Sequence, residues 1–268
     1  VAQQRICVVV LGDLGRSPRM QYHCRSLCRV GVAVDFVGYA ESPLVEELAA
    51  SPQLHFRALP KFPSVAAHGV FRLLLAPLKA LWMFFTLLFT LLFSVPRANS
   101  ILLQNPPSIP TLLVCLIVAR IRRSKLVLDW HNFGFSIVAL SFPPQANTLN
   151  AVVVGLCKWY ERTFGRLADA HVCVSDAMRV ELISHWGIRD AVVLHDCPPE
   201  FFHRATAEEK RNLFTREPLS KLFAGRDVQF VAVTATSFTK DEKLDMLLEA
   251  VQEFDEQGRQ LLITAEIK

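Results

Sequence analysis

The sequence lacks the residue patterns that build structural metal sites and disulfide frameworks. None of its seven cysteines forms a Cys-x-x-Cys pair, and Cys24 and Cys28 have no histidine partner at metal-ligand spacing. It contains no Asp-x-Asp motif, and His195 and His203 also lack a partner at ligand spacing. An odd, scattered set of cysteines, most of them in apolar runs, is typical of a reducing compartment. We therefore expect no bound metal, no cofactor, a structural role for both histidines, and a protein that faces the cytosol.

The sequence also has no internal repeat, no low-complexity segment and little net charge. Its formal charge is +4 over 268 residues, so nothing global points to nucleic acid. Apolar residues, in contrast, make up 51% of the chain. One basic cluster stands out, and it consists of Arg120, Arg122, Arg123 and Lys125. Such a cluster binds anionic lipid headgroups or a lipid-linked phosphate, or it is the solvated end of a helix.

Apolar strand-like segments alternate with helical patterns along most of the chain. This alternation predicts a buried parallel sheet in an α/β domain. The predicted strands are Ile6–Leu11, Ala33–Val37, Ser100–Leu103, Leu126–Asp129, Ala170–Val174, Ala191–Leu194, Val228–Val233 and Leu261–Thr264. The predicted helices are Pro18–Val30, Pro43–Ala50, Ile109–Arg120, Leu149–Leu167, Asp176–Trp186, Ala207–Phe214 and Asp241–Gln257.

The alternation restarts after a polar stretch, which indicates a domain boundary. We predict a first Rossmann-like domain over residues 1–204, a linker over 205–227 and the opening of a second domain over 228–268. Val1 is not a methionine, and Lys268 closely follows a strand-like segment. We therefore expect the chain to be part of a longer polypeptide.

Residues 70–96 interrupt the alternation with a long hydrophobic run. Residues 80–96 carry no charge, and Arg72, Lys79 and Arg97 flank the run. At about 1.5 Å per residue the uncharged part is roughly 25 Å long as a helix, short of the ~30 Å hydrocarbon core of a bilayer. Because the run is apolar on every face, we expect it to lie in one leaflet rather than to span the membrane or to be a buried core helix.

The most specific local pattern joins the first predicted strand to the first predicted helix. Gly12 and Gly15 follow the strand, and Ser17-Pro18 suits an N-cap and a first helical position. Glycines let the backbone approach a ligand closely, and the free N–H groups of a helix start attract phosphate. Arg16 and Arg19 add positive charge at the same place. The pattern predicts a diphosphate site, with an ordinary βα turn as the alternative.

Several segments, spread over nearly the whole chain, carry long motifs of one known family. They are Gly12–His23, Leu103–Pro110, Asp129–Phe135, Trp159–Arg162, Val174–Met178, Leu194–Pro199 and Thr236–Glu242. In these segments the chain resembles the chitobiosyldiphosphodolichol β-mannosyltransferases.

The resemblance implies a GT-B-type fold, in which two Rossmann-like domains face each other across a cleft. It also implies inverting transfer of mannose from GDP-mannose to dolichol-diphosphate-linked chitobiose, which forms a β-1,4 linkage. The place it implies is the endoplasmic reticulum membrane, on the cytosolic face, with membrane lipid and other transferases of the same pathway as further partners.

The chain departs from the family pattern in two places. It ends before the acidic, glycine-containing segment with which the family holds the sugar nucleotide, and residues 142–148 look less regular than the corresponding family region. We therefore expect the chain by itself to be inactive, although its parent protein is a transferase.

Inverting transfer needs a base near the acceptor hydroxyl and stabilisation of the departing nucleoside diphosphate. Asp129 and His131 follow a buried strand, where an α/β sheet presents ligands, and are the favoured catalytic candidates. His131 also resembles the histidine that many GT-B enzymes place beside the donor sugar. Asp13 in the glycine turn is a rival base. A cap or a salt bridge is the alternative role for Asp129.

Substrate- and diphosphate-binding candidates come from both predicted domains. They are Gly12, Gly15 and Arg16 near the diphosphate, Asn132 and Gly134 in the acceptor loop, and Thr236, Ser237 and Lys240 at the start of the second domain. Lys240 would supply the cation that leaving GDP needs if no metal is bound. Ser175 is read first as an N-cap.

Two other functions stay open at this point. One is a non-catalytic, membrane-docked Rossmann module that recruits a catalytic partner. The other is a transferase that uses another sugar nucleotide such as UDP-GlcNAc. The glycine turn and the Asp129-Trp-His131 motif favour an enzyme, since an anchor needs neither. The enzyme prediction requires the Gly15 corner and His131 to converge on one crevice.

Overall fold

The computed structural model describes residues 4–63, 70–142, 148–198 and 202–213, and shorter segments at 215–217, 219–224, 231–232, 234, 244–256 and 262–263. The chain divides into two compact units, residues 1–197 and residues 198–268. The residues that bear on function and that the structure describes belong to the first unit.

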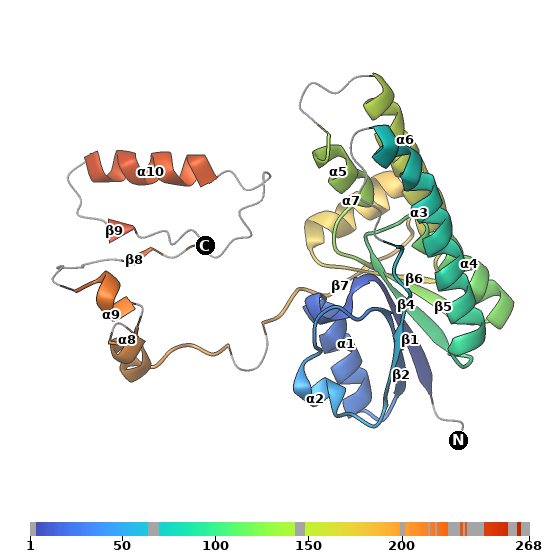
Figure 1. The fold of residues 1–268 in the computed structure, drawn as a ribbon, viewed down its shortest axis with the longest axis horizontal. Helices are drawn as coiled ribbons and strands as arrows, with labels where there is room; N and C mark the ends of the chain where they lie inside the picture. The colour runs from blue at the N-terminus through green and yellow to red at the C-terminus, as the bar shows by residue number, and fades with distance from the viewer. Residues whose placement is uncertain are drawn as a thin grey trace. The chain divides into compact units, whose positions relative to one another are not determined.

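The first unit is built on a seven-stranded sheet in the order β3-β2-β1-β4-β5-β6-β7, with every neighbouring pair parallel (Figure 1). The strands are β1 (Arg5–Asp13), β2 (Ala33–Tyr39), β3 (Leu54–Ala58), β4 (Ser100–Asn105), β5 (Lys125–Trp130), β6 (Ala170–Cys173) and β7 (Val192–Val193). The order reverses between β1 and β4, and in open α/β sheets ligands bind at the carboxyl ends of the strands at such a point.

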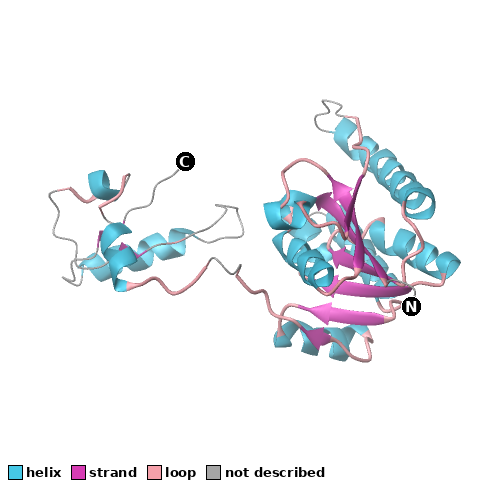
Figure 2. Cartoon of the chain, turned by 90° about the horizontal axis from the view of Figure 1, so that it is seen from below, coloured by secondary structure: helices cyan, strands magenta, loops and turns pink. Residues whose placement is uncertain are grey.

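Helices cover both faces of this sheet (Figure 2). They are α1 (Pro18–Arg29), α2 (Glu46–Ala49), α3 (Val70–Phe89), α4 (Thr111–Arg122), α5 (Gly134–Leu140), α6 (Thr148–Gly165) and α7 (Asp176–Trp186). Alternate residues of β1 enter two separate cores: Val8 and Val10 pack with α1 and α2, and Val9 packs with α4 and α7. Because both faces of β1 are buried, its sequence is an unbroken apolar run.

The hydrophobic run forms α3, which continues through a π-helical turn, η2 (Thr90–Ser94). By length and composition its 77–94 segment could cross a membrane, yet only 17% of that segment is buried in the protein. Leu87 and Leu91 are buried in the core, whereas Phe85 and Phe89 are each 61% exposed. The helix is therefore neither wholly a core helix nor free on every side, because one side of it packs against the unit.

The basic cluster at the end of α4 has mostly structural partners. Arg122 donates hydrogen bonds to the carbonyls of Leu92 and Val95 at the end of η2. Lys125 forms an ion pair with Asp169 at 2.9 Å. These contacts favour the helix-end interpretation of the cluster over a lipid-phosphate site.

The sequence did not predict two elements of the first unit, β3 and α5. β3 is a short edge strand whose sequence, Leu-His-Phe-Arg-Ala, lacks a long apolar run. α5 has only seven residues, too few to establish a helical period. Three helices and two strands are described in the second unit: α8 (Ala207–Leu213), α9 (Leu219–Leu222), α10 (Leu244–Glu256), β8 (Val231–Ala232) and β9 (Leu262–Ile263), with β8 parallel to β9.

Candidate active site

A pocket of about 550 Å³ opens at the carboxyl edge of the first unit's sheet. It is lined by Arg16, Ser17, Pro18, Arg19, Tyr22, His23, Ser26, Gln104, His131, Leu194, His195, Asp196 and Cys197. These residues come from the β1–α1 turn, α1, and the ends of β4, β5 and β7. Arg16, which follows Gly15 in the turn, and His131 therefore line the same crevice, whereas Gly12 and Gly15 are not among its lining residues.

Asp13, the last residue of β1, anchors the β1–α1 turn to the loop after β2. One oxygen of its carboxylate accepts hydrogen bonds from the backbone N–H groups of Gly15, Glu41 and Ser42, at 3.3, 3.1 and 3.0 Å. Hydrogen bonding, first from Ser42, lowers the pKa of the Asp13 carboxyl. A carboxylate with a lowered pKa is a weak base, so the structure favours an anchoring role for Asp13 over the predicted role of rival base.

The turn packs so closely against the loop after β2 that position 15 has room only for glycine. A Cβ atom at Gly15 would lie 2.5 and 2.6 Å from the backbone oxygens of Ser42 and Pro43, in the loop after β2. The close approach that excludes a side chain is thus to this loop rather than to a ligand. Gly12 has no such restriction, since its nearest neighbour would be 3.6 Å away.

The side chain of Ser17 does not cap α1, contrary to the sequence interpretation. Its hydroxyl donates to the carbonyl of Asp13 at 3.0 Å, while Pro18 occupies the first helical position as predicted. Ser175 does cap α7, because its hydroxyl accepts from the N–H of Met178 at 3.2 Å.

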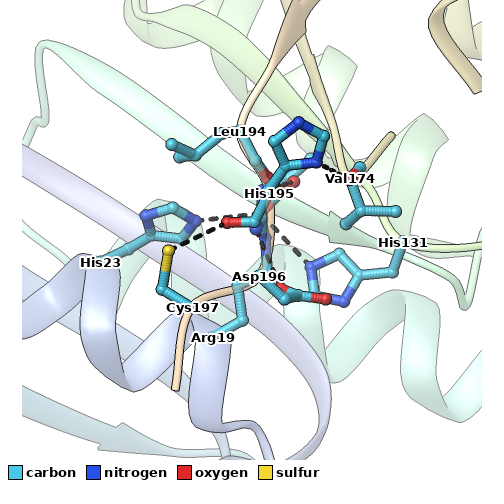
Figure 3. A network of polar contacts seen from close by, with 9 residues as sticks. Arg19, His23, His131, Val174, Leu194, His195, Asp196 and Cys197 are labelled. Atoms are coloured by element: carbon cyan, nitrogen blue, oxygen red, sulfur yellow. Dashed lines mark hydrogen bonds and ion pairs between the residues drawn. The ribbon is translucent and has the colours of Figure 1, made fainter. Parts of the chain in front are cut away.

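Asp129 is the electrostatic centre of the pocket, and its side chain is fully buried. Arg19 binds it with two parallel hydrogen bonds, Nε to Oδ2 at 2.9 Å and Nη2 to Oδ1 at 3.1 Å. His23 Nε2 and His131 Nε2 lie 3.1 and 3.3 Å from the same Oδ2 atom. Figure 3 shows the imidazoles of His23 and His131 on opposite sides of this network.

Burial alone would raise the pKa of Asp129. Hydrogen bonds from His131, His23 and Arg19 outweigh burial and hold the pKa far below its ordinary value. A fully buried carboxylate with these partners cannot reach an acceptor hydroxyl. Its burial and its contacts favour a positioning role for Asp129, exerted through its neighbours, over the predicted role as a catalytic group.

His131 gains a defined orientation from this contact. An ionised carboxylate only accepts hydrogen bonds, so a neutral His131 donates from Nε2 and keeps the lone pair on Nδ1. Its side chain is 20% exposed and lines the pocket. Nδ1 is thus available to accept a proton from a bound hydroxyl, which is the arrangement of an oriented general base.

The loop that carries His131 is fixed by a second buried carboxylate, Glu161 of α6. It accepts hydrogen bonds from Asn105 Nδ2 at 2.7 Å, from Ser108 Oγ at 2.8 Å and from the N–H groups of Gly134 and Phe135 at 2.8 and 3.1 Å. The N–H of His131 in turn donates to the carbonyl of Asn105 at 2.9 Å. Glu161 therefore fixes the start of α5 and, through Asn105, the backbone of His131.

The remaining predicted residues lie near the pocket or outside the described residues. Asn132 is exposed beside His131, and Gly134 starts α5 against Glu161, but neither lines the pocket. Arg16 does line it, with a side chain that is 83% exposed. Thr236, Ser237 and Lys240 lie outside the described residues.

Sequence reasoning gave no role to His23 or Glu161, and only a general charge to Arg19. For Glu161 the available signal was one acidic residue in a largely apolar helix, because burying its charge is costly unless it is paired. Arg19 and His23 lie on a polar helix, where such residues do not stand out. His195, expected to be structural, lines the pocket and contacts the carbonyl of Val174 through Nδ1 at 3.0 Å. Among the residues that the structure describes, no group of three or more His, Cys, Asp or Glu side chains could hold a metal ion.

The family profile described as "Glycosyl transferase 4-like domain" matches residues 15–196, which span the sheet and the pocket. The chain belongs to this family. The glycosyl transferase 4-like chain is 38% identical to "UDP-glycosyltransferase TURAN" of Arabidopsis thaliana, over 94% of its own length and 60% of that protein. It is 36% identical to the "Chitobiosyldiphosphodolichol beta-mannosyltransferase" of Mus musculus, over 95% of its length and 57% of that protein.

The chain therefore spans about 60% of the length of these relatives. Among solved structures, apo UGT2 of Phytolacca americana matches with a TM-score of 0.53 and 12% identity, covering 98% of this chain and 63% of that one. The likeness concerns the fold, and it confirms the prediction of an α/β, GT-B-type architecture. The family match likewise confirms the resemblance on which the sequence interpretation rested.

Proposed function

We propose that the full-length parent of this glycosyl transferase 4-like chain transfers mannose from GDP-mannose to dolichol-diphosphate-linked chitobiose, with inversion at the anomeric carbon. The observation that carries the proposal is the Asp129–His131 pair in a pocket at the carboxyl edge of the sheet. The mouse relative, whose name states a chitobiosyldiphosphodolichol β-mannosyltransferase, supports this choice of acceptor and sugar.

In the proposed reaction, Nδ1 of His131 takes the proton of the acceptor hydroxyl as that oxygen attacks the anomeric carbon. The bond between this carbon and the phosphate oxygen breaks, and GDP leaves with the electron pair. Arg16, exposed at the mouth of the pocket, contributes positive charge to a diphosphate. Arg19 cannot do so in the same way, because its guanidinium is already paired with Asp129 and Asp196.

We further propose that the enzyme works on the cytosolic face of the endoplasmic reticulum membrane, with α3 in one leaflet. The packing of Leu87 and Leu91 in the core supports a one-leaflet position, since a full span would require α3 to leave the sheet. Other transferases of the pathway are proposed as neighbours at the membrane. Residues 1–268 alone are expected to transfer no mannose.

A transferase for another sugar nucleotide is the second candidate, because the Arabidopsis relative is named a UDP-glycosyltransferase. A non-catalytic membrane module explains neither His131 nor its carboxylate partner. The full-length enzyme, supplied with dolichol-diphosphate-linked chitobiose, is tested with GDP-mannose and separately with UDP-GlcNAc. Product with UDP-GlcNAc alone would overturn the choice of donor.

The role of His131 is tested by His131→Ala in the same full-length protein. We expect kcat to fall by about a hundredfold or more, because a positioned general base contributes on this scale. His185→Ala is the matched control, since His185 is exposed on α7 and pairs only with Glu181 among the described residues. Unchanged turnover in His131→Ala would overturn the role of His131 as the base, whereas a full-length protein that binds membrane but transfers neither sugar would support the non-catalytic module.

A further inference from the structure

A second exposed apolar surface lies on α5 and α6, separate from α3. We define the α5–α6 face by the side chains of Ile137 and Leu140 on α5 and Leu149, Val152, Leu156 and Trp159 on α6, which are 43–65% exposed. The four residues on α6 are spaced by three, four and three positions, so they form one stripe along the helix. Contiguous apolar patches of this kind mark interaction sites.

Along residues 148–166, the exposed charged side chains are all basic. Lys158, Arg162 and Arg166 are exposed next to it or one turn beyond its end. Glu161 is the one acidic residue between positions 148 and 166, and it is buried in contact with Asn105 and the start of α5. A surface that combines apolar side chains with exposed basic side chains complements anionic phospholipid.

The length of the stripe matches one leaflet. Leu149 and Trp159 are ten positions apart, which is about 15 Å along a helix, half of the ~30 Å hydrocarbon thickness. Trp159 stands at the end of the stripe and Arg162 one turn further. Tryptophan is enriched at the boundary between hydrocarbon and headgroups, and arginine reaches the phosphates.

We propose that the α5–α6 face enters the cytosolic leaflet of a bilayer that contains anionic phospholipid, with Leu140 and Leu149 deepest and Trp159 at headgroup level. The inference rests on the membrane association proposed above, but not on the transferase chemistry. α4 packs against both α3 and α6, so both apolar helices lie on one side of the sheet (Figure 1).

The proposed contact with the bilayer bears on the candidate active site, because α5 begins three residues after His131 and Glu161 connects the two. A bilayer that holds α5 and α6 therefore fixes the height of the His131 imidazole above the lipid. The acceptor carries its diphosphate at the same boundary, so the surface would set where along a lipid-linked sugar the base can act.

Binding is tested with the whole chain and vesicles of phosphatidylcholine mixed with phosphatidylserine, by co-sedimentation. Leu156→Asp is expected to weaken partitioning into the vesicles by roughly tenfold, because it removes a leucine side chain that the bilayer would bury and adds a negative charge. Val180→Asp is the matched control, since Val180 is 57% exposed on α7. We expect Val180→Asp to partition as strongly as the unsubstituted chain.

Depth is tested by tryptophan quenching in a Trp82→Phe background, because Trp130 and Trp186 are buried. Trp159 should be quenched most by phospholipids brominated near the headgroup. With Trp159→Phe, Leu149→Trp should be quenched most by phospholipids brominated near the chain end. Circular dichroism of every variant checks that the fold is retained.

The outcomes separate the two proposals. If the unsubstituted chain binds vesicles and Leu156→Asp binds equally well, the α5–α6 inference is wrong and membrane association stands. If the unsubstituted chain does not bind vesicles, the α5–α6 inference and the proposed membrane association are both wrong. If Leu156→Asp changes the oligomeric state while vesicle binding is unchanged, the face is a contact between copies of this chain and the inference is wrong.

Discussion

At the scale of single residues, one carboxylate organises the pocket. Asp129 Oδ2 is shared by Arg19, His23 and His131, so removing its charge affects a buried guanidinium and two imidazoles together. The tautomer of His131 depends on the same atom, because only an acceptor at Nε2 keeps the proton there.

Asp129→Asn is expected to reduce kcat of the full-length enzyme by about a hundredfold or more, since the amide can donate as well as accept and no longer fixes the His131 tautomer. It should also destabilise the protein by about 3 kcal/mol, because Arg19 loses its buried counter-charge. Steady-state kinetics and urea unfolding measure the two effects.

Asp35→Asn is the control for this substitution. Asp35 is also fully buried and paired with arginines, Arg5 at 2.7 Å and Arg57 at 3.4 Å, but it lies on β2 and does not line the pocket. It should lower stability and leave kcat of the folded enzyme unchanged. Equal losses of kcat in both variants would show that Asp129 acts only on stability.

A buried histidine makes stability depend on pH. His171 of β6 accepts a hydrogen bond at Nδ1 from the indole N–H of Trp130, at 3.2 Å, and burial lowers its pKa to about 4. The unfolded chain takes up this proton near pH 6.5, whereas the folded protein does not. The free energy of unfolding should therefore fall as the pH drops from about 6.5 to about 4, by up to roughly 3 kcal/mol.

Urea unfolding followed by fluorescence over this pH range measures the dependence, with His171→Gln as the comparison. Glutamine at position 171 does not titrate, so the free energy of unfolding of the variant should vary less over the same pH window. An identical pH slope in the two proteins would contradict the assignment to His171.

At the scale of elements, the pocket depends on how closely two loops pack. Gly15→Ala places a methyl group within 2.6 Å of backbone atoms of Ser42 and Pro43, which cannot yield as a flexible side chain does. We expect a loss of about 1–3 kcal/mol in the free energy of unfolding. Separation of the loops should also break hydrogen bonds to Asp13 and raise KM.

The element-scale control is Gly155→Ala on α6. A Cβ atom there would meet nothing within 4 Å. The free energy of unfolding should rise by up to about 1 kcal/mol, since alanine is the better helix former. Thermal unfolding of both variants decides the point: equal effects of the two substitutions would mean that the contact with Ser42 and Pro43 is unimportant.

At the scale of the whole molecule, the first unit holds every strand of the seven-stranded sheet and every residue of the pocket. A fragment of residues 1–197 should therefore fold by itself, with a cooperative thermal transition and the emission of buried Trp130 and Trp186. A fragment with broad, non-cooperative melting would show that the first unit needs residues after Cys197.

The sequence allowed prediction of the elements with long or strongly periodic patterns. β1, α1, β5 and α7 were placed within a few residues, because apolar runs and helix-start signals are local. β3 was missed because an edge strand needs few apolar residues. The hydrophobic run was identified, but its division into a packed and an exposed side depends on Leu87 and Leu91 meeting residues far along the chain.

The candidate site was predicted in part. The meeting of Arg16 and His131 followed from parallel topology, since the carboxyl ends of all strands share one edge. The sequence could not predict that Asp129 is a buried carboxylate that orients its neighbours. Its partners Arg19 and His23 lie 110 and 106 positions away in the sequence. Pairings over such distances have no local signature.

Arg19 also joins the middle of the sheet to the last residues of the first unit. Its Nη1 atom donates to the carbonyl of Leu194 at 2.7 Å and to Asp196 at 2.9 Å, while its other nitrogens hold Asp129. One guanidinium therefore pairs both with the carboxylate between the two imidazoles and with the segment that ends the first unit. A change in the backbone at Leu194 or in the position of Asp196 would therefore act on the guanidinium that pairs with Asp129.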